Sequence, residues 1–269
     1  MFGVEENDPD DTYELTYDNC LKMLSTQCRF RANIPVVMMG ETGSGKTRLV
    51  KFMTALQRGR ADVDNMLILK IHGGTSSDDI NRTVQKAISA ARRNSAVGVK
   101  PTVVFFDEAN TTQAIGTIKT VMCDRHVEGV PIPDDIGLQF VAAVNPYREH
   151  SAAMIRKLEQ AGLGYSVHAE KTKDRIGKVP LRRLVYRVKE IPASMFPLIW
   201  DFGTLDSDTE KKYVSQMVSR LGEVSRNFAP LLLSVLCECQ EFMRRQSDEC
   251  SFVSLRQDDS RVTTASSDP

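Results

Sequence analysis

The stretch GETGSGKT, at residues 40–47, decides the fold of this chain. It matches the pattern G-x-x-x-x-G-K-[ST] at every fixed position. Glycines in such a loop let successive backbone N–H groups turn toward one point, which makes a nest for an anion. In this pattern the lysine reaches the β- and γ-phosphates of a nucleotide, and the hydroxyl residue meets Mg²⁺. The residues expected to bind the nucleotide are Gly40, Glu41, Thr42, Gly43, Ser44, Gly45, Lys46 and Thr47.

The segments on either side of this loop favour a phosphate-binding loop over a chance glycine-rich turn. Residues 36–39, VVMM, predict a short buried strand. Residues 46–59, KTRLVKFMTALQRG, carry apolar side chains at helical spacing and end at a glycine. The N-terminal end of this helix would direct its dipole at bound phosphates. We therefore expect Lys46 and Thr47 to hold a nucleoside triphosphate and its metal ion.

Two adjacent carboxylates end another apolar run, VVFFDEAN at residues 103–110. Because burying unpaired carboxylates is costly, Asp107 and Glu108 at this position favour a catalytic site. The alternative is a strand that runs into a solvent-exposed loop, where acids are common. We expect Asp107 to orient Mg²⁺, directly or through water, and Glu108 to polarise the attacking water.

Asn145 ends a further apolar run, FVAAVNP at residues 140–146. A neutral amide at this point could hold the attacking water or touch the γ-phosphate. Asn-Pro is also a common turn starter, and that interpretation stays open. Together with the phosphate loop and the acid pair, Asn145 is the third candidate part of a catalytic site.

Strand and helix patterns alternate over the first two thirds of the chain. Predicted strands lie at residues 36–39, 65–74, 102–110, 138–146 and 184–192, and predicted helices at 46–59, 76–94 and 113–126. This alternation predicts an α/β fold with a five-stranded, mostly parallel sheet and helices on both faces. After Pro192 the pattern becomes helical. The predicted domains are a disordered acidic N-terminus (1–12), a nucleotide-binding α/β domain (13–192), a small helical lid (193–256) and a polar tail (257–269).

Composition excludes several classes of protein. Lys and Arg number 35, as do Asp and Glu, so the formal net charge is zero and no nucleic-acid partner is expected. No apolar run is long enough to cross a bilayer, and the acidic N-terminus lacks a signal peptide's pattern. The six scattered cysteines make no Cys-x-x-Cys pair, which is typical of free thiols in a reducing compartment. We expect a cytoplasmic protein.

The order of phosphate loop, Asp-Glu strand end, Asn strand end and helical domain is that of an AAA+ ATPase. The segments IPVVMMGETGSGKTRL, VVFFDEANTT, FVAAVNPYR, VPLRRLVYRVKEIP and PLIWDFG resemble an AAA+ module of the mysterin family of giant ring-finger E3 ubiquitin ligases. The resemblance covers residues 12–256. It implies an AAA+ P-loop NTPase fold with a lid, ATP with Mg²⁺, and neighbouring AAA+ modules in a ring-like assembly that complete each other's sites.

The resemblance also assigns roles to arginines. Arg187 lies where such modules place an arginine finger for the neighbour's ATP, with Arg182 and Arg183 as rivals. A solvated basic edge explains the same residues equally well. Arg256, in VSLR, resembles the lid's sensor arginine, which would contact the γ-phosphate within the same module.

The chain departs from this family in two ways. After Arg256 it reads QDDSRVTTASSDP, without the periodicity of a further lid helix, so we expect an incomplete lid in a fragment or truncated form. The cysteines cannot make a ring finger's zinc cross-brace, so ubiquitin transfer is expected only through missing domains. Two functions stay open: Mg-dependent ATP binding and hydrolysis that sets ring conformation, or a structural module that binds ATP without hydrolysing it alone.

Overall fold

The computed structural model describes residues 8–10, 13, 15–160, 175–203, 207–219 and 228–245. The chain divides into two compact units. The first comprises Met1–Gly40, Gly45–Pro146 and Val188–Gly203, and the second comprises Glu41–Ser44, Tyr147–Arg187 and Thr204–Pro269.

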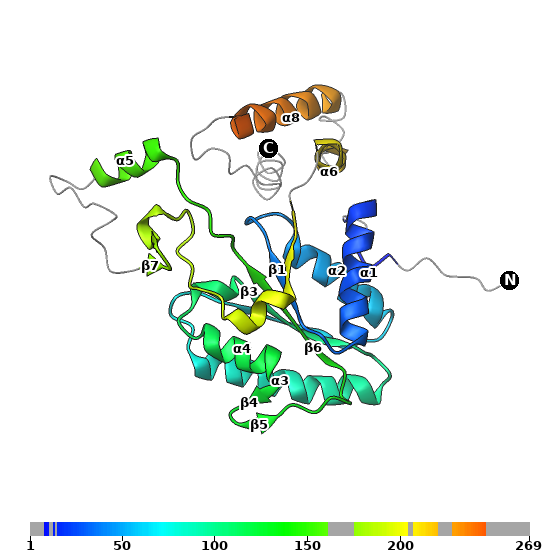
Figure 1. Cartoon of the computed structure of the whole chain (residues 1–269). Helices are drawn as coiled ribbons and strands as arrows, with labels where there is room; N and C mark the ends of the chain where they lie inside the picture. The colour runs from blue at the N-terminus through cyan, green and yellow to red at the C-terminus, as the bar shows by residue number, and fades with distance from the viewer. Residues whose placement is uncertain are drawn as a thin grey trace, which may run out of the picture. The chain divides into compact units, whose positions relative to one another are not determined.

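The first unit is built of parallel strands and the helices that connect them (Figure 1). Its helices are α1 (Tyr17–Arg31), α2 (Lys46–Arg58), α3 (Ser77–Ala96) and α4 (Ile115–Cys123). Its strands are β1 (Val36–Met39), β2 (Met66–Lys70), β3 (Thr102–Asp107), β4 (His126–Val127), β5 (Val130–Pro131), β6 (Leu138–Val144) and β9 (Ile199–Asp201).

Five of these strands form one sheet in the order β2-β3-β6-β1-β9, and every neighbouring pair is parallel. The carboxyl ends of the strands therefore meet at one edge of the sheet. β4 and β5 form a separate antiparallel hairpin. The predicted α/β fold with a five-stranded parallel sheet is confirmed.

Helices cover both faces of the sheet, because the apolar residues 103–106 of β3 need burial on both sides. Successive side chains of a strand point to opposite faces. Phe105 packs in the cluster that contains Phe52 of α2, whereas Phe106 packs in the cluster that contains Ile118 of α4. Both phenylalanines are fully buried. Figure 1 shows α1 and α2 on one side of the sheet and α3 and α4 on the other.

The position predicted for the fifth strand, residues 184–192, is wrong. The fifth strand is β9, which pairs with β1 from Val37↔Ile199 to Met39↔Asp201. Val188 and Ile191 are buried but stand three residues apart, which does not fit the two-residue period of a strand. The N–H of Lys189 instead donates to the carbonyl of Asn110 at 2.6 Å, which anchors an irregular segment. The sheet thus continues beyond residue 192, where the sequence predicts the lid to begin.

The second unit is mostly helical in its described parts. Its elements are α5 (Ala152–Gln160), β7 (Arg175–Ile176), β8 (Val179–Pro180), α6 (Ser207–Ser219) and α8 (Ala229–Arg245). β7 and β8 form an antiparallel hairpin. α6 and α8 pack through Val214 and Val218 against Leu232 and Leu236. α6 and α8 agree with the helical pattern predicted after Pro192.

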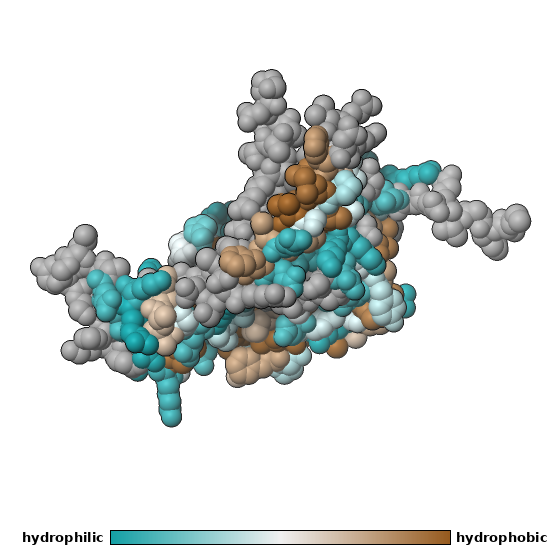
Figure 2. All heavy atoms as spheres, turned by 90° about the horizontal axis from the view of Figure 1, so that it is seen from above, coloured by the Kyte–Doolittle hydropathy of each residue, from teal (hydrophilic) through white to brown (hydrophobic). Residues whose placement is uncertain are grey.

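One face of α8 is apolar and exposed. Figure 2 shows apolar side chains gathered at the place of this helix. The exposed apolar residues here are Phe228, Leu231, Val235 and Phe242.

Three predictions fall on residues that the structure does not describe. Arg256 and the polar tail at residues 257–269 lie outside the described residues, as does most of the predicted acidic N-terminus. Among the described helices, none is long and apolar enough to cross a membrane.

Candidate functional site

The predicted site residues of the first unit lie at the carboxyl ends of three adjacent strands. Gly40 follows β1, Asn145 follows β6, and Asp107 is the last residue of β3. β6 pairs with both β1 and β3, so it lies between them. The N–H of Gly40 donates to the carbonyl of Val144 at 3.2 Å, which joins the start of the loop to the end of β6. Sheet order therefore brings the phosphate loop, the acid pair and Asn145 to one edge.

The loop between β1 and α2 has the backbone that its glycines permit. Gly43 has φ 80° and Gly45 has φ 92°, both in the left-handed region that favours glycine. Gly45 is also the N-cap of α2, where no side chain caps the helix and the first turn holds no acidic residue. By contrast, Ser76 and Asp79 form a capping box at the start of α3. The positive end of the α2 dipole is thus not offset by a carboxylate of its own first turn, which suits an anion.

Lys46 is a largely buried lysine at the start of α2, only 7% exposed. Its Nζ donates to the carbonyl of Gly40 at 2.8 Å, so the ammonium group closes the loop on itself. Thr47 and Asp107 are both half-buried. A hydroxyl and a carboxylate are oxygen ligands of the kind that Mg²⁺ prefers. Two such donors fit a metal ion that a nucleotide would also ligate. Within the described residues, no cluster of three or more His, Cys, Asp and Glu residues could hold a metal.

Glu108 has an unusual backbone conformation for a residue with a side chain. Its φ of 58° and ψ of 41° lie in the left-handed region. Such a conformation costs about 1–3 kcal/mol and tends to occur at functional sites. Thr111 supports it, because the backbone N–H and the Oγ1 of Thr111 both donate to the Glu108 carbonyl, at 3.0 Å and 2.9 Å. The chain therefore turns sharply at the residue expected to act on water.

Asn110 links two of the predicted site segments and was not singled out from the sequence. It is fully buried, and its Nδ2 donates to the carbonyl of Asn145 at 2.8 Å. Its Oδ1 accepts from the N–H of Asn145 at 3.0 Å. The only sequence signal is its place directly after the acid pair, in DEAN. A buried amide must find hydrogen-bond partners, but the sequence does not name them.

Glu41 and Thr42 contact residues of the second unit, to which they belong. The Oη of Tyr186 donates to Glu41 Oε2 at 2.6 Å and accepts from Thr42 Oγ1 at 3.0 Å. Arg148 Nη1 lies 3.2 Å from Glu41 Oε1. Burial, together with the hydrogen bond to Glu41, raises the pKa of Tyr186 to about 12. The sequence predicted Glu41 and Thr42 as loop residues and missed Tyr186 and Arg148, which lie far along the chain.

The candidate arginines of the second unit differ in exposure. Arg187 is exposed and follows Tyr186 directly, whereas Arg183 is half-buried. The side chain of Arg182 is outside the described part of the structure, as is the whole of Arg256. The predicted roles of these arginines therefore stay predictions.

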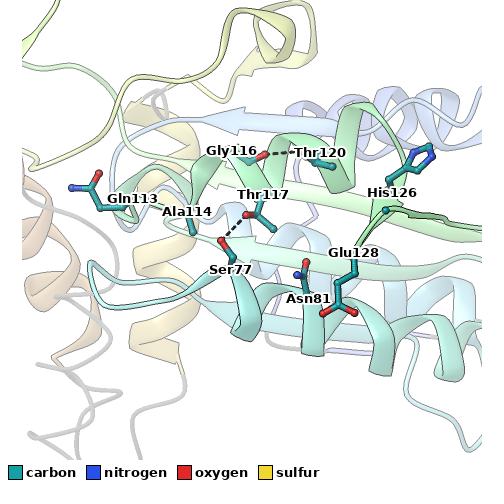
Figure 3. Close-up of a pocket in the computed structure, with 10 residues that line it drawn as sticks. Ser77, Asn81, Gln113, Ala114, Gly116, Thr117, Thr120, His126 and Glu128 are labelled. Atoms are coloured by element: carbon teal, nitrogen blue, oxygen red, sulfur yellow. Dashed lines mark hydrogen bonds between the residues drawn. The ribbon is translucent and has the colours of Figure 1, made fainter.

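The first unit also has a pocket of about 420 Å³, which is lined by other segments of the chain (Figure 3). Ser77 and Asn81 of α3 face Thr117 of α4, and His126 and Glu128 come from the β4–β5 hairpin. Ser77 Oγ and Thr117 Oγ1 are 2.8 Å apart and share a hydrogen bond. None of the predicted site residues lines this pocket.

Comparisons with known proteins point to one family. The family model for the RNF213 AAA domain matches residues 13–148. The chain is 52% identical to human E3 ubiquitin-protein ligase RNF213 over 255 residues, and 53% identical to zebrafish E3 ubiquitin-protein ligase rnf213-beta over 252 residues. It is 51% identical to mouse E3 ubiquitin-protein ligase RNF213 over 252 residues. These matches cover 94%, 93% and 93% of this chain but only 5% of each relative.

Proposed function

We propose, from the premise that the chain belongs to the RNF213 AAA domain family, that this AAA+ module binds ATP together with Mg²⁺ and hydrolyses the ATP. One observation carries the proposal. The loop GETGSGKT follows the interior strand β1, and Asp107, Glu108 and Asn145 end or follow the parallel strands β3 and β6 at the same edge of the sheet. Ligands of open α/β sheets bind at the carboxyl ends of the strands.

The phosphates would lie along the loop. Backbone N–H groups of residues 40–47 and the N-terminal end of α2 would receive them, because Gly43 and Gly45 give the loop its turned backbone. Lys46 would exchange its contact with the Gly40 carbonyl for the β- and γ-phosphates. A buried ammonium group gains most from an anionic partner, which supports this role.

Thr47 and Asp107 would hold Mg²⁺, which when bound offsets charge on the phosphates. Thr47 offers its hydroxyl, and Asp107 its carboxylate at the end of β3. Glu108 would act as the general base that takes a proton from the attacking water. Asn145, held through its backbone by Asn110, would position that water or the γ-phosphate.

The proposed mechanism also involves arginines that lie outside the strands and loop described above. We propose that an arginine of this module, Arg187 before Arg182 or Arg183, serves the ATP of a neighbouring AAA+ module, because Arg187 is exposed. A neighbour's arginine and Arg256 of the lid would complete the site here. The chain spans a twentieth of its relatives' length, so ring assembly, ubiquitin transfer through other domains and a cytoplasmic location are proposals for the whole protein.

Calorimetric titration of the chain with ATP in the presence of Mg²⁺ tests binding. We expect Lys46→Ala to abolish binding, because the loop loses its cation. Lys51→Ala, at an exposed lysine of the same helix, is the matched control and should bind like the wild type. Equal affinity of the wild type and Lys46→Ala would contradict the proposal.

A further inference from the structure

We propose that Arg148 and Tyr186 are positioning residues that neutralise and hold Glu41, so that the phosphate loop can accept an anion. This inference rests on the proposed function, because it concerns how the same loop binds ATP. Nothing in the loop motif requires a carboxylate at its second position. The contacts of Glu41, Thr42, Arg148 and Tyr186 carry the inference.

Glu41 presents an electrostatic problem. It stands in a loop that would receive a triphosphate, one residue from Gly40, whose carbonyl contacts the Lys46 ammonium. A carboxylate near phosphates repels them, and the repulsion is strong where the surroundings are only partly solvated. Glu41 is half-buried, so water alone screens its charge poorly.

Two groups take up both oxygens of this carboxylate. The Arg148 guanidinium lies 3.2 Å from Oε1, and the Tyr186 hydroxyl donates to Oε2 at 2.6 Å. The guanidinium supplies a compensating charge, and the two contacts together fix the direction of the carboxylate. The same hydroxyl accepts from Thr42 Oγ1 at 3.0 Å, so Tyr186 holds two successive loop residues.

Backbone pairing keeps Arg148 and Tyr186 beside each other. The N–H of Val185 donates to the carbonyl of Arg148 at 2.8 Å, and the N–H of His150 donates to the carbonyl of Arg183 at 2.7 Å. Glu149 and Leu184 form an antiparallel bridge between these bonds. The two side chains that meet Glu41 therefore come from adjoining positions of one paired backbone rather than from independent loops.

The affinity of the chain for ATP with Mg²⁺ measures this role. Arg148→Ala leaves Glu41 charged without its guanidinium partner, so we expect ATP affinity to fall about tenfold, and less at 1 M salt, where charges are screened. Tyr186→Phe should lower affinity several-fold. Arg92→Ala and Tyr17→Phe, at exposed positions of α3 and α1, are matched controls and should bind as the wild type does. Arg148→Lys keeps the charge and should lose less affinity than Arg148→Ala.

A double variant separates charge compensation from mere structural support. In Arg148→Ala/Glu41→Gln the repelling charge is gone, so we expect affinity to return to near the wild-type value. A structural defect caused by Arg148→Ala would persist in the double variant. Urea unfolding of each variant confirms that affinities are compared among folded proteins, and Arg148→Lys replaces Arg148→Ala should the latter not fold.

Each outcome decides between the two proposals. Weakened binding that Glu41→Gln restores supports the positioning role. Wild-type affinity in Arg148→Ala and Tyr186→Phe, with binding abolished by Lys46→Ala, overturns this inference and leaves the proposed function intact. Weakened binding without rescue also overturns it. A wild-type chain that does not bind ATP overturns the proposed function, and the inference with it.

Discussion

The side-chain amide of Asn110 holds the backbone of Asn145 from both sides, donating to its carbonyl at 2.8 Å and accepting from its N–H at 3.0 Å. Both residues are buried, so water cannot readily replace these bonds. The pair ties the turn after β3 to the end of β6. Two predicted catalytic positions, Glu108 and Asn145, therefore belong to segments with a fixed mutual arrangement.

Asn110→Ala should destabilise the fold, because it removes both partners of the Asn145 backbone. Each buried group left unsatisfied costs about 1–3 kcal/mol, and the free energy of unfolding in urea measures the loss. Asn110→Asp turns a carboxylate oxygen toward the Asn145 carbonyl in a fully buried site, so it should lose at least as much stability. Asn81→Ala, on α3, is the control and should change stability by less than about 0.5 kcal/mol. Wild-type stability of Asn110→Ala would show that these bonds do not hold the segment.

Glu108→Gln should bind ATP like the wild type but not hydrolyse it, because an amide cannot accept the proton of the attacking water. General-base catalysis is worth roughly 10²–10⁴ in rate, so single-turnover hydrolysis should slow by that factor. Glu128→Gln is a matched control: Glu128 is exposed and has a positive φ of 50°. Hydrolysis retained in Glu108→Gln would assign the base to another residue.

Gly45→Ala should destabilise the fold through the backbone alone. A Cβ at Gly45 meets nothing within 4 Å, but its φ of +92° lies where side chains are strained. We expect unfolding free energy to fall by about 1–2 kcal/mol. Gly116→Ala, in α4 and also free of clashes, should instead raise it by about 0.5–1 kcal/mol. Urea unfolding of both variants checks the contrast, and equal effects would refute the role of φ.

The raised pKa of Tyr186 predicts that the stability of the fold depends on pH under alkaline conditions. Its folded pKa is raised to about 12, whereas in the unfolded chain the phenol titrates near about 10. A raised folded pKa contributes stability below about pH 10 that is lost as the pH rises through about 12. The stability difference between the wild type and Tyr186→Phe should therefore shrink between about pH 10 and about pH 12. Tyr17→Phe, at an exposed tyrosine, should show no such change. A difference independent of pH would contradict the shifted pKa.

Sequence patterns predicted the fold where apolar runs were long and their ends were marked. β1 is apolar throughout and β3 and β6 are mostly apolar, and the loop after β1 follows a fixed spacing of glycines and lysine. β9 was missed because a three-residue edge strand leaves no periodicity to detect. Residues 184–192 were wrongly predicted as a strand because their valines and isoleucine have strand-forming side chains. Two buried residues of this segment, Val188 and Ile191, are three residues apart, whereas a strand buries every second residue.

The supporting residues of the site could not be predicted for another reason. Asn110 and Asn145, or Glu41 and Tyr186, meet only because the folded chain brings distant segments together. Local patterns identify the groups that would touch a nucleotide, since their spacing is dictated by the ligand. The partners that hold those groups are dictated by packing, which leaves no local mark.

The place of β1 between β6 and β9 has a consequence for how the chain folds. β1 emerges early in synthesis, yet both strands that pair with it, β6 and β9, lie far along the chain. Such pairings have high contact order, and the entropy of closing long loops must be overcome before they form. The strand that carries the phosphate loop therefore waits for one partner until residues 138–144 have been made, and for the other until residues 199–201 have been made. Under the proposed function, ATP would bind the finished sheet alone, and its binding would shift the folding equilibrium toward the completed module.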